Sequence, residues 1–292
     1  MKVLMVGATG GRAGLVLPEL LKRGITVRAL VRNEQRAHAA RRNGAAETVI
    51  ADLADPASLR AAVSGVEGVF HINPAFAPRE ADMGVAMVEA AQAAGVRKFV
   101  FSGVIHPSIS AMSNHAAKQR VEDALYRSRM DFTVLQPARF MQNWAGPWRE
   151  VVEHGRLPMP YAVTAKFCWV DYRDVAEVAA RAMTSNELGY GTFELCAPGM
   201  SDGLQLAGMI SEELGRLVEA QQIPRESFAA SQMPAGPMRE GLTRMLAHYD
   251  QYGLPGGNSA VLRTILGREP RSTRQYFREL VTHPHLAAPS TA

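Results

Sequence analysis

The sequence is short of cysteine and of long apolar runs. Its 292 residues include two cysteines, Cys168 and Cys196, whose separation fits neither a disulfide framework nor the closely spaced thiols of a metal site. No apolar run approaches the roughly 18 residues that a membrane-spanning helix needs, and the first residues have the pattern of a strand rather than of a signal peptide. We therefore expect a cytoplasmic protein without a membrane segment or a metal site.

The sequence also lacks an excess of charge of one sign. It has 32 Lys and Arg residues against 28 Asp and Glu residues, and its formal net charge of +4 is too small to indicate a nucleic-acid-binding surface. The densest basic cluster, Arg36, Arg41 and Arg42, has no aromatic residues between its members and is typical of a solvated helix face. We expect no direct contact with nucleic acid.

Strand-like and helix-like patterns alternate along the first half of the chain. Asp55 and Pro56 predict a capped helix start within this pattern. The βαβα order is typical of an α/β fold, a doubly wound parallel sheet of the Rossmann type with helices on both faces. The strand-like runs are 2–6, 26–31, 47–50, 68–72, 98–102 and 132–136, and the helical patterns lie near 15–23, 34–43, 57–63, 82–94 and 116–127.

The second half of the chain is less regular. We expect a strand over 167–171, a helix capped by Asp171 that continues to Met183, and a last sheet strand over 191–195. Helical patterns rich in methionine come after that strand. The predicted division is a core of residues 1–139, joined by 171–197, and a smaller, mostly helical lobe of residues 140–170 and 198–292.

A glycine-rich loop stands between the first strand and the first helix of the predicted core. Gly7 can supply a tight turn, Gly10 lets backbone N–H groups approach a pyrophosphate, and Ala13 lets the helix pack closely on the strand. The helix N-terminus then favours the anion. A turn with a purely structural role is the alternative. The predicted dinucleotide-binding residues of this loop are Gly7, Thr9, Gly10, Gly11, Arg12 and Ala13.

The end of the second predicted strand bears on the choice of cofactor. An NAD-binding domain usually has an Asp or Glu there for the ribose 2′-hydroxyl, whereas this sequence has Arg32. The planar guanidinium of Arg32 suits a 2′-phosphate, and Arg12 could join it. We therefore predict NADP(H) as the preferred cofactor and NAD(H) as the alternative. Arg32 and Arg36 could instead be solvated charges that tolerate either cofactor.

Polar and small residues follow the next three strands, at the edge where ligands of such sheets bind. Asp52 and Leu53 could meet the adenine, although Asp52 could instead belong to the approach to the next helix. Asn73 follows the fourth strand, and Ser102 with Gly103 follows the fifth. We predict that these three residues line the nicotinamide ribose.

Lys118 lies on the helix after the fifth strand. Its ammonium could point toward the strand ends and hold ribose hydroxyls. The alternative is a surface pair with Glu122, one turn further along the helix, which would stabilise the fold by only a few tenths of a kcal/mol.

Several of these segments together resemble one family. They are Gly7-Ala8-Thr9-Gly10, Ala29-Leu30-Val31-Arg32, Asp52-Leu53, His115-x-x-Lys118 and Gln136-Pro137-Ala138-Arg139-Phe140-Met141-Gln142-Asn143. The chain resembles the NmrA-like branch of the atypical short-chain dehydrogenases/reductases. The resemblance implies a Rossmann core, a small C-terminal lobe that closes over the cofactor, and NAD(P) binding. It also implies either a working reductase of quinones or dyes, or a regulator that catalyses nothing.

The sequence departs from the wider superfamily at the Tyr-x-x-x-Lys pair. Asn114 stands where the tyrosine would be, and Val104 is near the place of the usual serine. Asn114 cannot donate a proton at neutral pH, so His115 or Lys118 would have to supply it, or the acceptor would need little acid. His115 titrates near neutrality in principle, although a surface or capping role is the alternative.

Aromatic residues follow the sixth predicted strand. Phe140, Asn143 and Trp144 could wall an apolar substrate pocket, or they could be contacts between core and lobe. Two function classes remain. One is an NAD(P)H-dependent reductase of a small, flat, apolar acceptor that is quinone-, dye- or enone-like. The other is an NADP(H)-binding redox sensor that acts through a regulatory protein partner. The chain could also form a homodimer.

Overall fold

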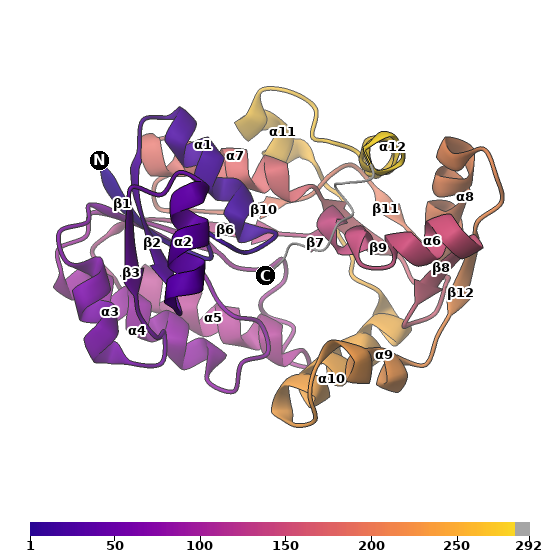
Figure 1. Ribbon diagram of the computed structural model, residues 1–292, viewed down its shortest axis with the longest axis horizontal. Coiled ribbons are helices and arrows are strands. Elements are labelled where there is room, and N and C mark those ends of the chain that lie inside the picture. The colour runs from indigo at the N-terminus through magenta and orange to yellow at the C-terminus, as the bar shows by residue number, and fades with distance from the viewer. Residues whose placement is uncertain (284–292) are drawn as a thin grey trace.

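The computed structural model describes residues 1–283 and contains a seven-stranded parallel sheet with strand order β10-β6-β5-β4-β1-β2-β3 (Figure 1). This order confirms the predicted doubly wound fold. The order reverses at β1, where β4 lies on one side and β2 on the other. The strands are β1 (Lys2–Val6), β2 (Thr26–Val31), β3 (Glu47–Ile50), β4 (Gly68–Ile72), β5 (Lys98–Ser102), β6 (Asp131–Pro137) and β10 (Gly191–Leu195).

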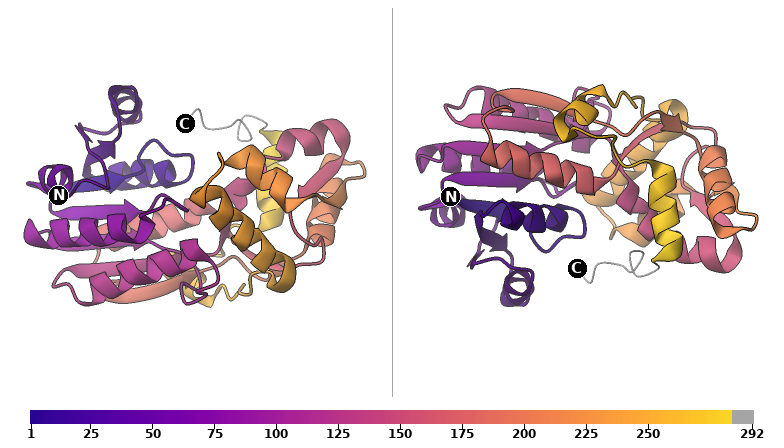
Figure 2. Two further views of the ribbon diagram at one scale, coloured as in Figure 1. Left: turned by 90° about the horizontal axis from the view of Figure 1, so that it is seen from below. Right: turned by 90° about the horizontal axis from the view of Figure 1, so that it is seen from above.

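Helices cover both faces of the sheet (Figure 2). Successive side chains of β1 alternate between the two faces: Val3 and Met5 join one apolar core, and Leu4 and Val6 join the other. One layer is α1 (Val16–Lys22), α2 (Glu34–Arg42) and α7 (Tyr172–Thr184), and the other is α3 (Pro56–Val63), α4 (Glu80–Ala93) and α5 (Ser113–Tyr126).

Two predicted helix starts have the expected caps. The Asp55 carboxylate accepts hydrogen bonds from the N–H groups of Ala57 and Ser58, and Pro56 occupies the first helical position of α3. The Asp171 carboxylate likewise accepts from the Arg173 N–H at the start of α7. Both helices therefore begin where the sequence predicts them.

Most of the other described elements lie at the carboxyl end of the sheet, to the right in Figure 1. Its strands form two small sheets, β11-β9-β7 and β12-β8, which extend the predicted helical lobe. The strands are β7 (Arg139–Phe140), β8 (Arg156–Met159), β9 (Phe167–Val170), β11 (Met200–Ser201) and β12 (Glu219–Gln222). The helices are η2 (Met141–Ala145), α6 (Trp148–His154), α8 (Gly203–Leu214), α9 (Arg225–Gln232), α10 (Pro237–Tyr252), α11 (Ala260–Leu266) and α12 (Thr273–Thr282).

The division into core and lobe stays a prediction. One helix of the predicted lobe, α11, packs on β10 and α7 of the core. An aromatic cluster stabilises the lobe: Trp144 lies on Trp169 at a centroid distance of 4.8 Å, and Trp148 stacks on Phe277 at 6.2 Å. Of the helices within residues 1–283, none has the length and apolar character needed to cross a membrane.

Candidate functional site

The glycine loop makes a tight turn at the carboxyl end of β1. Gly7 has φ +84°, and an added Cβ would lie 2.8 Å from the Ala13 Cβ. Only glycine fits both the backbone conformation and this space. The Gly10 N–H donates to the Gly7 carbonyl at 2.9 Å, and the Gly14 N–H donates to the Gly10 carbonyl at 2.8 Å. The helix starts early as a 3-10 turn, η1 (Ala13–Leu15), so a helical N-terminus lies at the point where the strand order reverses.

Arg12 links this loop to the lobe. Its guanidinium donates a hydrogen bond of 2.5 Å to the Asn143 Oδ1 in η2. The contact joins two predicted site residues that are 131 positions apart in the sequence, one from the cofactor set and one from the pocket set.

Arg32 and Asp52 lie at the neighbouring strand ends. Arg32 is exposed, and within residues 1–283 its guanidinium has no hydrogen bond or ion pair. One Asp52 carboxylate oxygen accepts from the Ala54 N–H at 2.9 Å, and the Asp52 N–H donates to the Ser58 hydroxyl. Asp52 therefore takes part in the turn that leads into α3, and its contact with the adenine stays a prediction. Leu53 beside it is half-buried.

The side chains of Asn73 and Ser102 already have partners inside the protein. The Asn73 Oδ1 lies 2.6 Å from the His71 Nε2, and its amide N–H donates to the Glu80 carbonyl at 2.9 Å. The Ser102 hydroxyl lies 3.0 Å from the Tyr172 hydroxyl, and burial raises the pKa of Tyr172 to about 12. The sequence revealed neither Tyr172 nor His71. Gly103 donates its N–H to the Leu135 carbonyl at 2.8 Å.

Lys118 forms a buried ion pair with Glu80 of α4. Lys118 is 5% exposed and Glu80 is 4% exposed. The other Glu80 oxygen accepts from the Phe76 N–H at 2.7 Å, and burial raises the pKa of the Glu80 carboxyl. The alternative of a surface pair with Glu122 is wrong, because Glu122 is itself buried and accepts from the Gln136 amide at 3.0 and 2.9 Å.

His115 is buried rather than a surface residue or a cap. It is 1% exposed, and its Nδ1 lies 3.1 Å from the His106 carbonyl oxygen. Burial, helped by the charge of Lys118, lowers the pKa of His115 to about 4. The imidazole is therefore neutral near pH 7, so His115 is not a protonated acid there.

Asn114 lies one turn before Lys118, where the sequence analysis predicts the tyrosine position of the wider superfamily. It is 8% exposed, and its amide N–H points to the Met245 sulfur of α10 at 3.6 Å. Its Oδ1 is buried and has no hydrogen-bond partner among the described residues. A buried amide oxygen left unpaired is costly. The helix that carries it, α5, packs against α10 of the lobe.

The predicted pocket residues divide between two environments. Phe140 is half-buried and meets the ring of Tyr172 edge-on at a centroid distance of 4.8 Å. Asn143 accepts from Arg12, as described above. Trp144 is 4% exposed and packs in the aromatic cluster of the lobe. For this residue the structure favours the alternative, a packing contact, over a place in the pocket wall.

The sequence analysis missed one further cluster next to these residues. The Arg139 guanidinium carbon lies 4.8 to 5.4 Å from the centroids of four aromatic rings. The Arg139 Nη1 donates a hydrogen bond to the hydroxyl of one of them, Tyr161. The rings come from three separate segments, the residues before β9, β9 itself and α10, so sequence spacing could not reveal them. The one available signal was the position of Arg139 directly after the sixth strand. The rings are Tyr161, Phe167, Trp169 and Tyr249, and we call them the ring cage.

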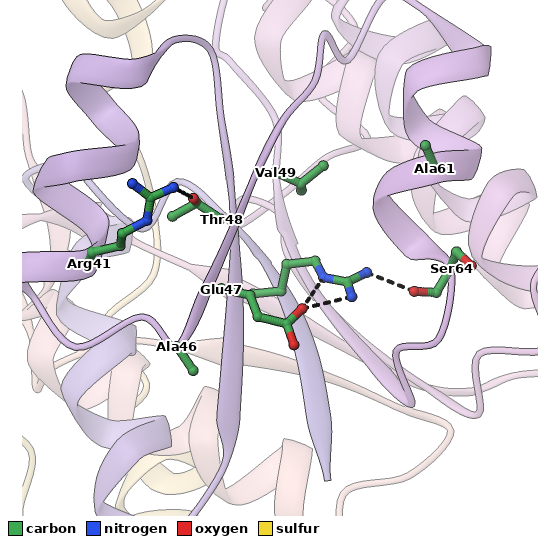
Figure 3. Close-up of a pocket in the computed structure, with 8 residues that line it drawn as sticks. Arg41, Ala46, Glu47, Thr48, Val49, Ala61 and Ser64 are labelled. Atoms are coloured by element: carbon green, nitrogen blue, oxygen red, sulfur yellow. Dashed lines mark hydrogen bonds and ion pairs between the residues drawn. The ribbon is translucent and has the colours of Figure 1, made fainter.

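A surface depression on β2 and β3 is no candidate for this site (Figure 3). It lies toward the amino ends of these strands, away from the glycine loop. Its polar groups already pair with one another: Arg28 donates to Glu47 at 2.8 Å, and Arg41 donates to the Thr48 hydroxyl at 2.6 Å.

Comparison with known proteins extends this description. The chain is 30% identical over 280 residues to the NAD(P)H azoreductase of Xenophilus azovorans, covering 94% of this chain and 96% of that protein. It is 27% identical over 286 residues to quinone oxidoreductase 2 of Escherichia coli (strain K12), covering 96% and 98%. The crystal structure of the Citrobacter sp. triphenylmethane reductase complexed with NADP(H) has the same fold, with a TM-score of 0.82 at 21% identity, covering 96% of this chain and 99% of that one.

The family resemblance noted from the sequence is thereby tested over almost the whole chain. The model of the NmrA-like family matches residues 1–276, which include the glycine loop, the strand ends and most of the lobe. On this match, the chain belongs to the NmrA-like family.

Proposed function

We propose that this protein is an NAD(P)H-dependent reductase of a small, flat, largely apolar acceptor such as a quinone or a dye. The azoreductase and the quinone oxidoreductase match the chain over nearly their whole lengths, which supports a reductase. The observation that carries the proposal is the glycine loop at the reversal of strand order, because dinucleotides bind at that point in doubly wound sheets.

The loop fits a pyrophosphate. A Cβ at Gly7 would meet Ala13, and a Cβ at Gly10 would lie 3.3 Å from the Gly7 carbonyl oxygen, so glycine at both positions supports the tight turn. This turn precedes the N-terminus of η1, and helix N-termini bind phosphate groups. Arg12 adds a cation beside the loop. The proposed contacts are Gly7, Thr9, Gly10, Gly11, Arg12 and Ala13 for the pyrophosphate, Asp52 and Leu53 for the adenine, Asn73, Ser102 and Gly103 for the nicotinamide side, and Lys118 for the ribose.

NADP(H) is the proposed preference over NAD(H). The Arg32 guanidinium is exposed, has no partner among residues 1–283 and follows the strand whose end faces the adenosine ribose in this fold. Its five donors can form paired hydrogen bonds to a phosphate, whereas a ribose hydroxyl would use only one of them.

The chain offers little acid at the predicted proton-donor positions. When bound, the nicotinamide supplies the hydride. Asn114 replaces the tyrosine, and His115 is neutral because its pKa is about 4. Lys118 is held by the Glu80 carboxylate, so its proposed role is to position the ribose. Solvent then supplies the proton, and an acceptor that needs little acid help, a quinone or a dye, fits this site best.

Calorimetric binding of NADPH and NADH, followed by NADPH oxidation with quinones and azo dyes, tests the proposal. We expect tight NADPH binding with steady turnover of at least one acceptor. Asn114 at the tyrosine position favours a second candidate, a dinucleotide-binding regulator. Tight binding without turnover of any acceptor would support that candidate, and failure to bind either nucleotide would contradict both.

A further inference from the structure

Arg139 is a half-buried cation whose charge no carboxylate among the described residues balances. Its guanidinium carbon lies 4.9 Å from the ring centroid of Tyr161, 4.8 Å from those of Phe167 and Trp169, and 5.4 Å from that of Tyr249. Within residues 1–283, Arg139 forms no ion pair. The negative ring faces attract the cation, but they offset only part of the cost of removing a full charge from water.

Other half-buried arginines of this chain are paired differently. Arg173 binds the carboxylates of Asp171 and Glu279, and Arg268 binds those of Asp174 and Glu177. These four acidic groups neutralise the two cations inside the protein. Arg139 differs from both in that its surroundings supply rings in place of anions.

The Arg139 guanidinium also keeps free hydrogen-bond donors. One nitrogen donates to the Tyr161 hydroxyl, and no acceptor in the described residues faces the other two side-chain nitrogens. Neither of those two nitrogens is fully buried. They therefore reach the surface, where a ligand anion could accept from them.

One face of α10 connects the ring cage with the tyrosine position of α5. Tyr249 belongs to the cage, Met245 one turn earlier contacts Asn114, and a Cβ on Gly241 another turn earlier would lie 3.2 Å from the Ser113 hydroxyl. Figure 1 shows α10 beside α5 at the junction of core and lobe. Arg139 thus lies on the side of the site where the proposed acceptor would bind.

We propose that Arg139 and the ring cage bind the anionic group of a flat aromatic acceptor, a sulfonate or a carboxylate. The planar fork of a guanidinium matches the oxygens of both groups. The four rings are themselves buried, so they position the guanidinium and leave its free nitrogens for the ligand anion. This inference rests on the proposed reductase function, because it names the class of acceptor for that same site.

Binding of redox-inert probes tests the inference without turnover. Calorimetry would compare naphthalene-2-sulfonate with naphthalene-2-sulfonamide, which has a similar shape and no charge, on the full chain with NADP⁺ present. We expect the sulfonate to bind at least about tenfold more tightly, the scale of one charge-assisted hydrogen bond. Equal affinities of the unaltered protein for the two probes would overturn the inference, whatever any variant does.

Arg139→Met supplies the matched variant, because it keeps an apolar stem in the cage and removes the charge. It should lose about tenfold in affinity for the sulfonate and leave the sulfonamide unchanged, and Arg139→Lys should lose less. Equal losses on both probes would mean a packing role and would overturn the inference. NADPH oxidation with azobenzene-4-sulfonate and azobenzene-4-sulfonamide separates the two proposals, because absence of turnover with both contradicts the reductase alone.

Discussion

Two cations near the proposed site, one buried and one half-buried, differ in the groups that surround them. Lys118 is paired with the carboxylate of Glu80, whose second oxygen accepts from the Phe76 N–H, so the protein itself satisfies the charge. Arg139 lies among four rings and has donors to spare. The difference indicates that Lys118, whatever contact it makes with the ribose, has its counter-charge inside the protein, whereas Arg139 has none until a ligand anion binds. Removing a charge partner should therefore affect stability at Lys118 and ligand binding at Arg139.

The largest effect should follow loss of the Lys118 partner. Glu80→Gln keeps the size of the side chain and leaves the Lys118 ammonium buried without a counter-charge. A buried ion pair broken in this way costs about 3–5 kcal/mol of unfolding free energy. Urea denaturation followed by circular dichroism measures the change.

The double variant Glu80→Gln/Lys118→Met is the control for that experiment. It removes both charges, so it should recover a large part of the lost stability, as other buried pairs do when both partners are replaced. A double variant that is less stable than Glu80→Gln alone would contradict the assignment of the loss to an unpaired Lys118 charge.

The next largest effect is a loss of unfolding free energy in mild acid, caused by two buried histidines close to Lys118. Burial lowers the pKa of both His71 and His115 from 6.5 to about 4. Stability is complete above pH 6.5 and falls as the pH drops toward 4, because only the unfolded chain takes up these protons. Between pH 7 and pH 5 we expect a loss of about 2 kcal/mol for each histidine. Denaturant titrations at several pH values measure it.

One further group affects the pH dependence, and one variant serves as its control. The raised pKa of Glu80 acts in the opposite direction, because it favours the folded form at low pH and opposes it as the pH rises. His115→Asn removes one of the two histidines and should reduce the slope of stability against pH. A slope that is unchanged in this variant would show that His115 is not neutral in the folded protein.

Local features of the sequence predicted the core well and the charge pairs poorly. The tight turn at Gly7 and the caps at Asp55 and Asp171 depend on residues a few positions apart, so their pattern is visible in the chain. Lys118 had an obvious neighbour in Glu122, yet its partner is Glu80, 38 positions away. Only the packing of α4 against α5 brings these two side chains together.

The ring cage shows the same limit more strongly. Phe167 and Trp169 lie on one short strand, but Tyr161 precedes it and Tyr249 comes from α10. No spacing rule connects these positions with Arg139. The sequence left two interpretations open for Trp144. Its contact with Trp169, which only the folded structure reveals, supports the packing role.

A smaller stability effect is expected at Arg139. Arg139→Met removes four cation–π contacts and the hydrogen bond to Tyr161, but no ion pair within residues 1–283. It also removes the cost of burying a charge, so we expect a net loss of about 1 kcal/mol. The same urea titration measures it, and its comparison with Glu80→Gln tests the distinction between the two cations directly. A loss as large as that of Glu80→Gln would mean that the ring cage needs the charge for folding, and the distinction would then fail.

The smallest stability effect, with a clear binding effect, is expected at Arg32. Its guanidinium is exposed and has no partner in the described chain, so Arg32→Asp should change the unfolding free energy by less than about 0.5 kcal/mol. NADPH binding should weaken by about tenfold or more, because a charge-assisted contact to the 2′-phosphate is lost, and NADH binding should be spared. Arg36→Asp, four residues later in the first turn of α2, makes the same change of charge and should affect NADPH much less. Equal losses for NADPH and NADH, or equal effects of the two variants, would contradict a phosphate contact at Arg32, since a general change of surface charge would then account for the result.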